Sequence, residues 1–387
     1  MITGIGFVAP ATLNEALDGR LNTLFPAVPE ITAFEIPEGL PTWGFEVLDL
    51  GLNKHLPHIK SFVDRTSALA LVAAKHALVD AGLEQAIIAA PVAATPTAPA
   101  ANNENIEIGC AYGTTLGCLE AMGIFWNKIK TSNPKFAPPL PFTHGYANSP
   151  SSLLCIEYKL RGPAATFSGE NLAGIEAFTF AFDQIAASSG EIILVGASES
   201  LTPAAYNHLY ATGQLSQTGQ WNDGIIPGEG AAMIVLESED SARRRGARSY
   251  AEVEAVDFFD SQQSTCPELH ASTPLEEQVY FCATTADCST ANLPFVATHP
   301  YTGDMLSASP MLRIALAAGV LAGKFALSTE VGHPGLPLLC NAGVSPATQP
   351  LTISSKAYSQ SPRVAVAIGY ERSGRKAHVR LRKCGTA

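Results

Sequence analysis

Short apolar runs that alternate with longer helical patterns constrain the fold of this chain more than any other feature. Glu191–Gly196 and Ala231–Glu237 are almost wholly apolar, which is typical of strands buried on both faces of a parallel or mixed sheet. Asp64–Gly82 carries apolar residues at three- and four-residue spacing and ends on glycine, which predicts a helix. The alternation predicts an α/β protein with helices sandwiched between sheets and covering them.

The same pattern continues to the end of the sequence and suggests two βα halves. Further strands are predicted at 1–8, 106–112, 250–256, 278–284, 294–298, 363–369 and 377–383, and further helices at 117–130, 171–188 and 309–323. We therefore expect one unit built from an N-terminal half, 1–240, and a C-terminal half, 241–387. The stretch from the first strand to about residue 59 is expected to be irregular, and the spans 89–105 and 258–277 carry no recognisable motif.

Composition limits the environment and the partners of the protein. With 387 residues, 47% of them hydrophobic, the chain can bury a substantial core. A formal net charge of -11 argues against nucleic acid or an anionic membrane as a partner. No apolar run approaches the roughly 18 residues of a membrane span. Eight scattered cysteines without a CxxC pair favour reduced thiols. We expect a cytoplasmic protein with no bound metal and no cofactor.

The stretch Gly162–Gly174 predicts a strand of small residues, a tight turn and the start of a helix. Glu170 and Asn171 stand at the turn. The positive end of a helix at such a turn would lower the pKa of a thiol and activate it as a nucleophile. A carboxylate or an amide cannot accept an acyl group as a thiolate does. Glu170 and Asn171 therefore provide no nucleophile for acyl transfer at this turn.

Six groups of residues, in order along the chain, match the motifs of one family. They are Asp64-Arg65, Gly109–Gly117, Arg161–Pro163, Ala197–Ser200, the group Asp223-Gly224, Gly228–Gly230 and Leu236-Glu237, and Ala242–Val253. Together they resemble the ketoacyl synthases of the thiolase superfamily over nearly the whole sequence. The resemblance implies a thiolase-like fold made of two pseudo-repeated βα halves.

The resemblance also implies where the catalytic residues of the family would fall, and none of them is present. The nucleophilic cysteine falls on Asn171, the first histidine falls near Ala283, and the second falls on Asp304. His299 takes the place of the family's lysine, and the last glycine-rich turn is altered at 368–374. The two family histidines bind the thioester carbonyl and the malonyl carboxylate, whereas a carboxylate at 304 would repel an anion. The loss of the cysteine, of both histidines and of the usual glycine-rich turn together argues against condensation chemistry at this site.

Glu170-Asn171 and the small residues after it are similar to the Glu-Gln signature of chain length factors, with Asn in place of Gln. These are the non-condensing subunits of type II polyketide ketosynthase heterodimers. The resemblance implies a catalytic ketosynthase as partner, an acyl carrier protein that docks mainly on that partner, and a dimer contact along Ala164–Ser168. Among such systems, aryl polyene and related polyene pathways are favoured over aromatic polyketides.

The helix predicted at 117–130 carries Leu119, Met122 and Trp126 at i, i+3 and i+7, so these side chains share one face. By resemblance, this face crosses the dimer interface and sets the depth of the partner's acyl tunnel, with Phe125 on a neighbouring face. The alternative is that the three residues form an ordinary core stripe. The spacing alone fits both interpretations.

Other interpretations remain for the degenerate site. Glu170-Asn171 could simply favour the start of a helix, or Asn171 could support malonyl-carrier decarboxylation that supplies starter units. A homodimeric binding or scaffold protein is a third alternative. His299 and His333 are expected to be structural and surface residues, respectively. The basic run Arg243–Arg248 fits a solvated helix end better than a docking surface for a carrier protein.

Overall fold

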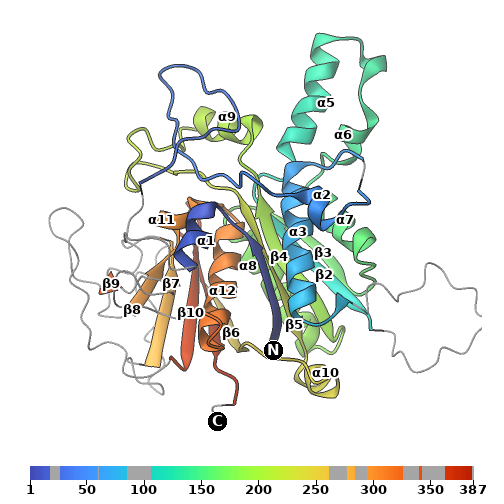
Figure 1. Ribbon diagram of the computed structural model, residues 1–387, viewed down its shortest axis with the longest axis vertical. Helices are drawn as coiled ribbons and strands as arrows, with labels where there is room; N and C mark the ends of the chain where they lie inside the picture. Colours follow the sequence, from blue (N-terminus) through green and yellow to red (C-terminus); the bar gives the residue numbers. More distant parts are fainter. Residues whose placement is uncertain are drawn as a thin grey trace, which may run out of the picture.

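The structure is a computed structural model, in which residues 1–17, 27–59, 61–84, 106–260, 277–283, 294–325, 340–341 and 362–385 are described. Two sheets dominate it, and helices lie between them and on the outer face of the first sheet (Figure 1). The predicted layered α/β architecture is confirmed.

The first sheet has five strands, all from the first 240 residues. Their order is β1 (Ile2–Val8), β5 (Gly230–Glu237), β4 (Ile192–Glu199), β2 (Ile108–Thr114) and β3 (Ala164–Ser168). β2 runs parallel to β3 and β4, whereas β5 runs antiparallel to β1 and β4. β2, β4 and β5 are buried along their whole length, which explains their apolar sequences. β3 stands last in the strand order of this sheet.

The second sheet has six strands, all from the C-terminal part of the chain. Their order is β6 (Glu252–Phe259), β11 (Lys376–Arg382), β10 (Val364–Tyr370), β7 (Gln278–Cys282), β8 (Pro294–Ala297) and β9 (Cys340–Asn341). The half-exposed strand predicted at 377–383 is therefore only partly correct. β11 pairs with a strand on each side, and Ala377, His378 and Val379 at its centre are all buried.

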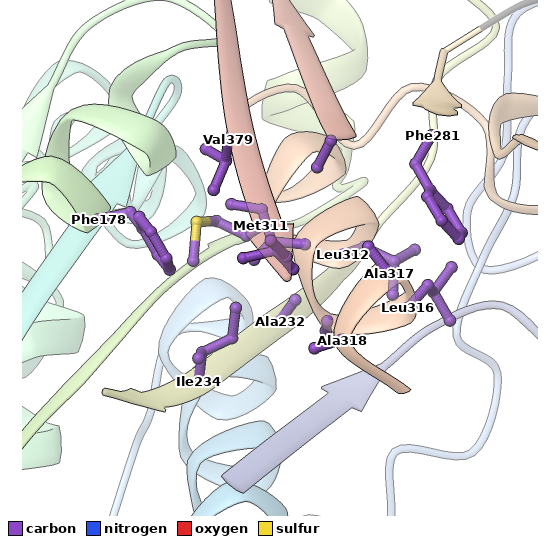
Figure 2. Close-up of a cluster of buried hydrophobic side chains, with 14 of the residues drawn as sticks. Phe178, Ala232, Ile234, Phe281, Met311, Leu312, Leu316, Ala317, Ala318 and Val379 are labelled. Carbon is purple, nitrogen blue, oxygen red and sulfur yellow. The ribbon is translucent and has the colours of Figure 1, made fainter. Parts of the chain in front are cut away.

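Two helices fill the space between the sheets. α8 (Ala173–Ala186) packs on β2 and β4, and α12 (Ala308–Leu321) packs on β5 and β10. Every residue of α12 is buried, and Figure 2 shows its Met311, Leu312 and Leu316 in this core. The two helices approach closely at Gly174, where an added Cβ would lie 2.4 Å from the Ser307 carbonyl oxygen. Glycine is therefore required at this crossing.

The outer face of the first sheet is covered by α3 (Arg65–Asp80) and α7 (Ser149–Glu157). Asp64 caps α3 through its side chain, which accepts a hydrogen bond from the Thr66 amide, and Gly82 follows the helix with φ 69°. These are the start and the stop that the sequence predicts. None of the described helices is long and apolar enough to cross a membrane.

Two short helices lie in the stretch that was expected from the sequence to be irregular, and others lie elsewhere in the chain. α1 (Ala11–Leu17) and α2 (Leu52–His55) fall between β1 and α3, and α9 (Pro203–Ala211), α10 (Glu239–Arg244) and α11 (His299–Thr302) are also short. One or two turns are too few to show a 3.6-residue periodicity, so a pattern search misses them.

A helical hairpin, residues 115–148, projects from the body between β2 and α7, and we call it the arm (Figure 1). It contains α5 (Leu119–Thr131), the short 3₁₀ helix η1 (Pro134–Phe136) and α6 (Pro139–Thr143). The helix predicted at 117–130 is α5. Its inner side packs on α6 and α9.

Candidate functional site

A pocket of about 310 Å³ gathers the degenerate positions that the sequence singled out. Asn171, Ala283, His299 and Asp304 all line it, although they are up to 133 positions apart in the sequence. The other lining residues are Trp221, Gly224, Ile225, Ile226, Leu306, Ser309, Pro310, Arg313 and Tyr370. No cysteine stands among these lining residues of the described chain.

Asn171 lies in the turn that joins β3 to α8. The Ala173 amide donates to the Glu170 carbonyl oxygen at 2.9 Å, so the chain turns sharply before α8 begins at Ala173, two residues later than predicted. Asn171 is partly buried and faces the pocket, whereas Glu170 is exposed at the same turn. The amide stands near a helix N-terminus, but it is not a nucleophile for an acyl group.

Ala283 and His299 are joined through the backbone at the end of the second sheet. Ala283 follows β7, and its carbonyl oxygen accepts a hydrogen bond from the His299 amide at 3.1 Å. His299 begins α11, directly after β8 and Thr298. Ala283 thus contributes only a methyl group to the pocket, and His299 contributes the nearby imidazole.

The protonation state of His299 follows from its contact with Arg313. Nη2 of Arg313 lies 3.1 Å from Nε2 of His299, and a guanidinium can only donate hydrogen bonds. Nε2 must therefore accept, so the imidazole is neutral and carries its proton on Nδ1. The 3.7 Å separation between Nε2 and Oδ1 of Asp304 is then not an ion pair.

Asp304 serves the turn that leads into α12. Its Oδ1 accepts a hydrogen bond from the Leu306 amide at 2.8 Å and lies 3.5 Å from Oγ of Ser309. Its backbone also bridges to the segment around Pro227 of the first half. The carboxylate therefore stabilises the turn before α12, and it also lines the pocket wall.

Arg313 is a residue of the site that sequence reasoning missed. Its side chain is buried and donates to Thr298 Oγ1 at 3.1 Å and to the Ile368 carbonyl oxygen. The sequence could have pointed to it, because Arg313 is the one charged residue in the segment 308–321, whose other residues are apolar or small. Trp221 was missed too, and its ring lies 5.8 Å from the His299 ring.

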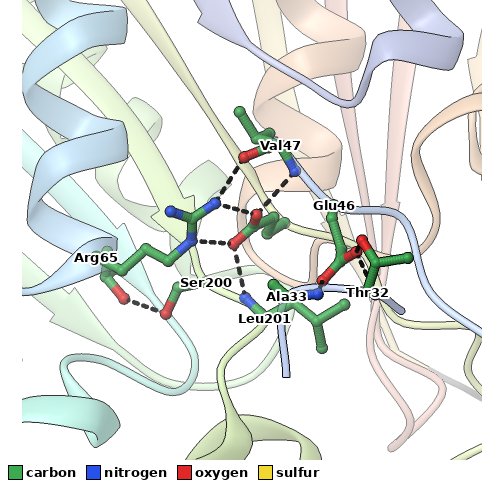
Figure 3. Close-up of polar contacts among 9 residues, drawn as sticks. Thr32, Ala33, Glu46, Val47, Arg65, Ser200 and Leu201 are labelled. Carbon is green, nitrogen blue, oxygen red and sulfur yellow. Dashed lines mark hydrogen bonds and ion pairs between the residues drawn. The ribbon is translucent and has the colours of Figure 1, made fainter. Parts of the chain in front are cut away.

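The family motifs outside the pocket hold the scaffold. Glu229 is buried and accepts from Arg65 Nε at 2.7 Å and Nη2 at 2.5 Å, and also from the amides of Val47 and Leu201 at 2.8 and 3.1 Å (Figure 3). The hydrogen bond to Glu229 raises the pKa of Arg65. A second carboxylate, Glu46, similarly accepts from nearby amides.

Glu199 joins three elements around the base of the arm. Its Oε1 accepts from Thr114 Oγ1 at 3.1 Å, from Ser307 Oγ at 2.5 Å and from the Thr115 amide, and its Oε2 accepts from the Leu116 amide at 3.1 Å. Burial raises the pKa of Glu199 to about 7, which the hydrogen bonds from Ser307 and the two amides partly oppose.

The predicted face of α5 is neither a core stripe nor uniformly exposed. Leu119 and Met122 are partly buried, whereas Trp126 is 51% exposed. An added Cβ at Gly145 would lie 2.9 Å from the Met122 terminal methyl carbon, which places Met122 against the turn after α6. The ordinary core stripe is therefore excluded for Trp126 in this chain.

Phe125 belongs to an aromatic row along the arm. Its ring centroid lies 5.6 Å from that of Trp126 and 5.0 Å from that of Phe142, which in turn lies 5.4 Å from Tyr146. Phe142 is 41% exposed and Tyr146 is 47% exposed. Exposed apolar groups that adjoin one another in this way are typical of an interaction surface.

The basic run 243–248 has intramolecular partners. Arg243 pairs with Glu239, Arg244 with Glu191 and Arg245 with the buried Glu237, while Arg248 stacks over the Tyr250 ring. His333 lies outside the described residues. Within the described residues, no three His, Cys, Asp or Glu side chains come together in a way that could hold a metal ion.

The chain resembles known proteins in sequence and in fold. A family model, "Beta-ketoacyl synthase, N-terminal domain", matches residues 44–242, just over half of the sequence. The tetracenomycin polyketide synthase ketoacyl synthase alpha subunit of Streptomyces glaucescens is 29% identical over 65% of this chain and 61% of its own length. The beta subunit from the same organism is 29% identical over 68% of this chain and 65% of its own length. The matches thus span less than two thirds of these relatives.

Comparison of folds extends the similarity over the whole chain. The solved structure titled "The ishigamide ketosynthase/chain length factor" superposes with a TM-score of 0.72 over 99% of this chain and 98% of that chain, at 19% sequence identity. A beta-ketoacyl synthase from Burkholderia phymatum gives a TM-score of 0.73 at 18% identity. The fold is that of the thiolase-like ketosynthases, and the chain belongs to the beta-ketoacyl synthase family.

Proposed function

We propose that this protein is a non-condensing chain length factor of a type II polyketide system. In this proposal it forms a heterodimer with a catalytic ketosynthase and shapes the acyl tunnel of that partner. Relatives named as alpha and beta subunits of a polyketide ketosynthase support the polyketide setting. The product class that we favour is an aryl polyene or a related polyene, and the division into halves 1–240 and 241–387 remains part of the proposal.

The observation that carries the proposal is the composition of the pocket. An acyl transfer site needs a nucleophile and groups that stabilise the developing oxyanion. The pocket is lined instead by an amide, a methyl group and a carboxylate, at the positions that the sequence resemblance assigns to the family's catalytic residues, and its histidine is contacted by a buried guanidinium. A malonyl group would meet the Asp304 carboxylate, which opposes decarboxylation at Asn171. The pocket therefore favours a partner subunit as the source of the chemistry.

Two exposed features support a partner subunit. The aromatic row with Trp126 lies on the arm, which projects beyond the body of the subunit (Figure 1). β3 (Ala164–Ser168) ends the strand order of the first sheet and is nowhere fully buried. An uncovered edge strand of this kind can pair with another chain. We propose that the partner covers both features and that Trp126, Met122 and Leu119 border its tunnel.

The carrier protein is assigned mainly to the partner. Carrier proteins are acidic, and this chain carries a formal net charge of -11. The densest basic run is already paired within the subunit. This leaves no cluster of unpaired arginines at 243–248 for docking an acidic surface.

Co-expression with a ketosynthase that carries an intact Cys-His-His set tests the assembly. We expect a stable complex on size-exclusion chromatography and a marked loss of solubility when this chain is produced alone. A stable homodimer that ignores the ketosynthase would instead support a scaffold protein. Acetyl carrier protein formed from malonyl carrier protein by this chain alone would support the decarboxylase and refute the non-catalytic assignment.

The Trp126→Ala variant tests the tunnel role within that complex. Removing the indole opens space, so the product should become longer while the complex still assembles. Leu48→Ala is the matched control, because Leu48 is 73% exposed but lies outside the arm. It should leave the product unchanged. An unchanged product from Trp126→Ala in an intact complex would overturn the tunnel role.

A further inference from the structure

The pocket around Asn171 has the size and the side chains of a small-molecule site. Its volume of about 310 Å³ falls within the range of ligand pockets, roughly 300–1,000 Å³. Among its lining residues, which all belong to the described chain, Asp304 and Arg313 are the two that carry a full charge. The kind of molecule that the pocket can bind therefore depends on how open these two charges are to a ligand.

The guanidinium of Arg313 is engaged by the protein itself. Its Nε donates to Thr298 Oγ1 at 3.1 Å, its Nη1 donates to the Ile368 carbonyl oxygen, and its Nη2 lies 3.1 Å from Nε2 of His299. Arg313 is also only 2% exposed. Each nitrogen of the group therefore has a partner within the subunit, and little of the positive charge is open to a ligand.

The carboxylate of Asp304 is more open. Its Oδ1 accepts from the Leu306 amide at 2.8 Å and lies 3.5 Å from Oγ of Ser309, whereas Oδ2 accepts no hydrogen bond from the described part of the chain. No lysine or arginine among the described residues forms an ion pair with it, and the side chain is 12% exposed. A carboxylate that is largely buried without a counter-ion is unfavourable, and a bound cation would stabilise it.

An aromatic ring lies close to this carboxylate. The centroid of the Trp221 ring lies 5.8 Å from that of His299, whose Nε2 lies 3.7 Å from Oδ1 of Asp304. Tyr370 also lines the pocket, but its ring centroid already has the Lys376 ammonium at 5.6 Å. The Trp221 ring has no such cation among the described residues. Because indole attracts cations more strongly than the other aromatic side chains, Trp221 can hold a cation that Asp304 attracts.

The backbone next to Asp304 also fits a binding site. Leu306 lines the pocket with φ 47°, a left-handed conformation that is unfavourable for a bulky side chain. Strained residues of this kind recur at ligand sites, where surrounding contacts hold them in place. Here the hydrogen bond from the Leu306 amide holds one carboxylate oxygen of Asp304 at the turn, and the second oxygen is left for a ligand.

We propose that the pocket binds a small organic ammonium ion, with Asp304 as its counter-ion and the Trp221 ring against its charged end. The side-chain carbonyl oxygen of Asn171 can accept a hydrogen bond from a hydroxyl or N–H group of such an ion. A ligand here goes beyond the proposed function, which gives the pocket none. Binding can be present whether or not the heterodimer forms.

Isothermal titration calorimetry with choline as the probe tests the site. The titration uses the full-length protein in the form in which it purifies, alone or with its ketosynthase. The matched ligand is the uncharged analogue of choline in which carbon replaces the nitrogen, so the shape is kept and only the charge is lost. We expect choline to bind, and the analogue to bind more weakly by about tenfold or more. Malonate, an anion, should not displace choline.

Variants of this chain locate the site. Asp304→Asn removes the charge but keeps an oxygen for the Leu306 amide, so it should abolish the preference for choline over the analogue. Trp221→Leu should weaken choline binding by about fivefold or more. Glu170→Gln is the matched control and should change nothing, because Glu170 is an exposed carboxylate at the Asn171 turn that does not line the pocket. A choline site in the ketosynthase would respond to none of these changes.

The comparison of the two ligands on the wild-type protein decides even if a variant fails to fold. Equal affinities of choline and its analogue, no binding of choline, or displacement by malonate would each overturn the proposal. Choline binding that Asp304→Asn leaves unchanged, or that Glu170→Gln weakens equally, would overturn it as well. None of these outcomes depends on whether a heterodimer assembles, so failure of this proposal is distinguishable from failure of the proposed function.

Discussion

Glu199 is the ionisable group whose replacement should change the pH dependence of stability most clearly. It is buried among four hydrogen-bond donors that come from the end of β2, the base of the arm and the turn before α12. Burial raises its pKa from the ordinary 4.5 to about 7 in the folded protein. The native state therefore holds a proton that the unfolded chain releases near pH 4.5.

The sign and the size of the effect follow from linkage. A group whose folded pKa is raised contributes stability below its unfolded pKa and loses that contribution as the pH rises through its folded pKa. Each pH unit between the two pKa values is worth about 1.4 kcal/mol. Glu199 should thus lower the free energy of unfolding by about 3 kcal/mol between pH 4.5 and a pH above 7.

Glu199→Gln imitates the protonated acid and should remove this slope. Its amide oxygen can accept at the Oε1 position, where Thr114, Thr115 and Ser307 donate, while the NH₂ group faces the Leu116 amide in place of Oε2. Losing that one hydrogen bond should cost about 1–3 kcal/mol at every pH.

Urea unfolding of both proteins from pH 4.5 to 8 is the assay, and the quantity of interest is the difference between their free energies of unfolding at each pH. This comparison cancels the groups that titrate equally in both proteins. We expect the wild type to lose its advantage over the variant as the pH rises. A constant difference across this range would refute the assignment of a raised pKa to Glu199.

Two further predictions concern other parts of the scaffold. Burial lowers the pKa of His378 to about 4. The stability that depends on this group is therefore present above pH 6.5 and is lost as the pH falls toward 4. His378→Phe should make the fold less sensitive to acid, measured as a smaller difference between the urea midpoints at pH 4.5 and pH 7.5. Ser188 has φ 57° just after α8, a left-handed conformation that favours glycine, so Ser188→Gly should raise the free energy of unfolding by about 0.5–1 kcal/mol. Gly213 has φ 64°, so Gly213→Ala should lower the free energy of unfolding by a similar amount. Equal shifts of the melting temperature in the two variants would contradict this reasoning.

Long or fully buried elements of the fold could be predicted from the sequence. The strands β4 and β5 and the helix α3 match their predicted positions within a few residues, because an apolar run or a 3.6-residue period over several turns leaves few alternatives. The helices α1 and α2 were missed because they are too short to show a period. The burial of β11 was underestimated because pairing on both sides depends on strands far away in the sequence.

The site was only half predictable, for a similar reason. Asn171, Ala283, His299 and Asp304 could be named in advance from motif positions, and they line one pocket. The contact of Arg313 with His299 could not, because no motif position drew attention to the arginine and the two residues meet only when α11 and α12 fold together. The neutral state of the imidazole depends on that contact, so it too could be read only from the structure.

The distribution of retained and altered motifs has a physical explanation. Arg65, Glu199 and Glu229 each satisfy several buried backbone or side-chain partners, and removing one member of such a network leaves the others unpaired at a cost of several kcal/mol. Folding alone therefore preserves these residues, whether or not the protein is catalytic. By the sequence resemblance, Asn171 stands where the family carries its nucleophile, and the turn and α8 are in place around it. Buried network residues such as Arg65 indicate the fold, whereas only the residues at the reacting centre indicate the reaction. A chain can therefore match its family closely in the buried networks and differ from it at the reacting centre.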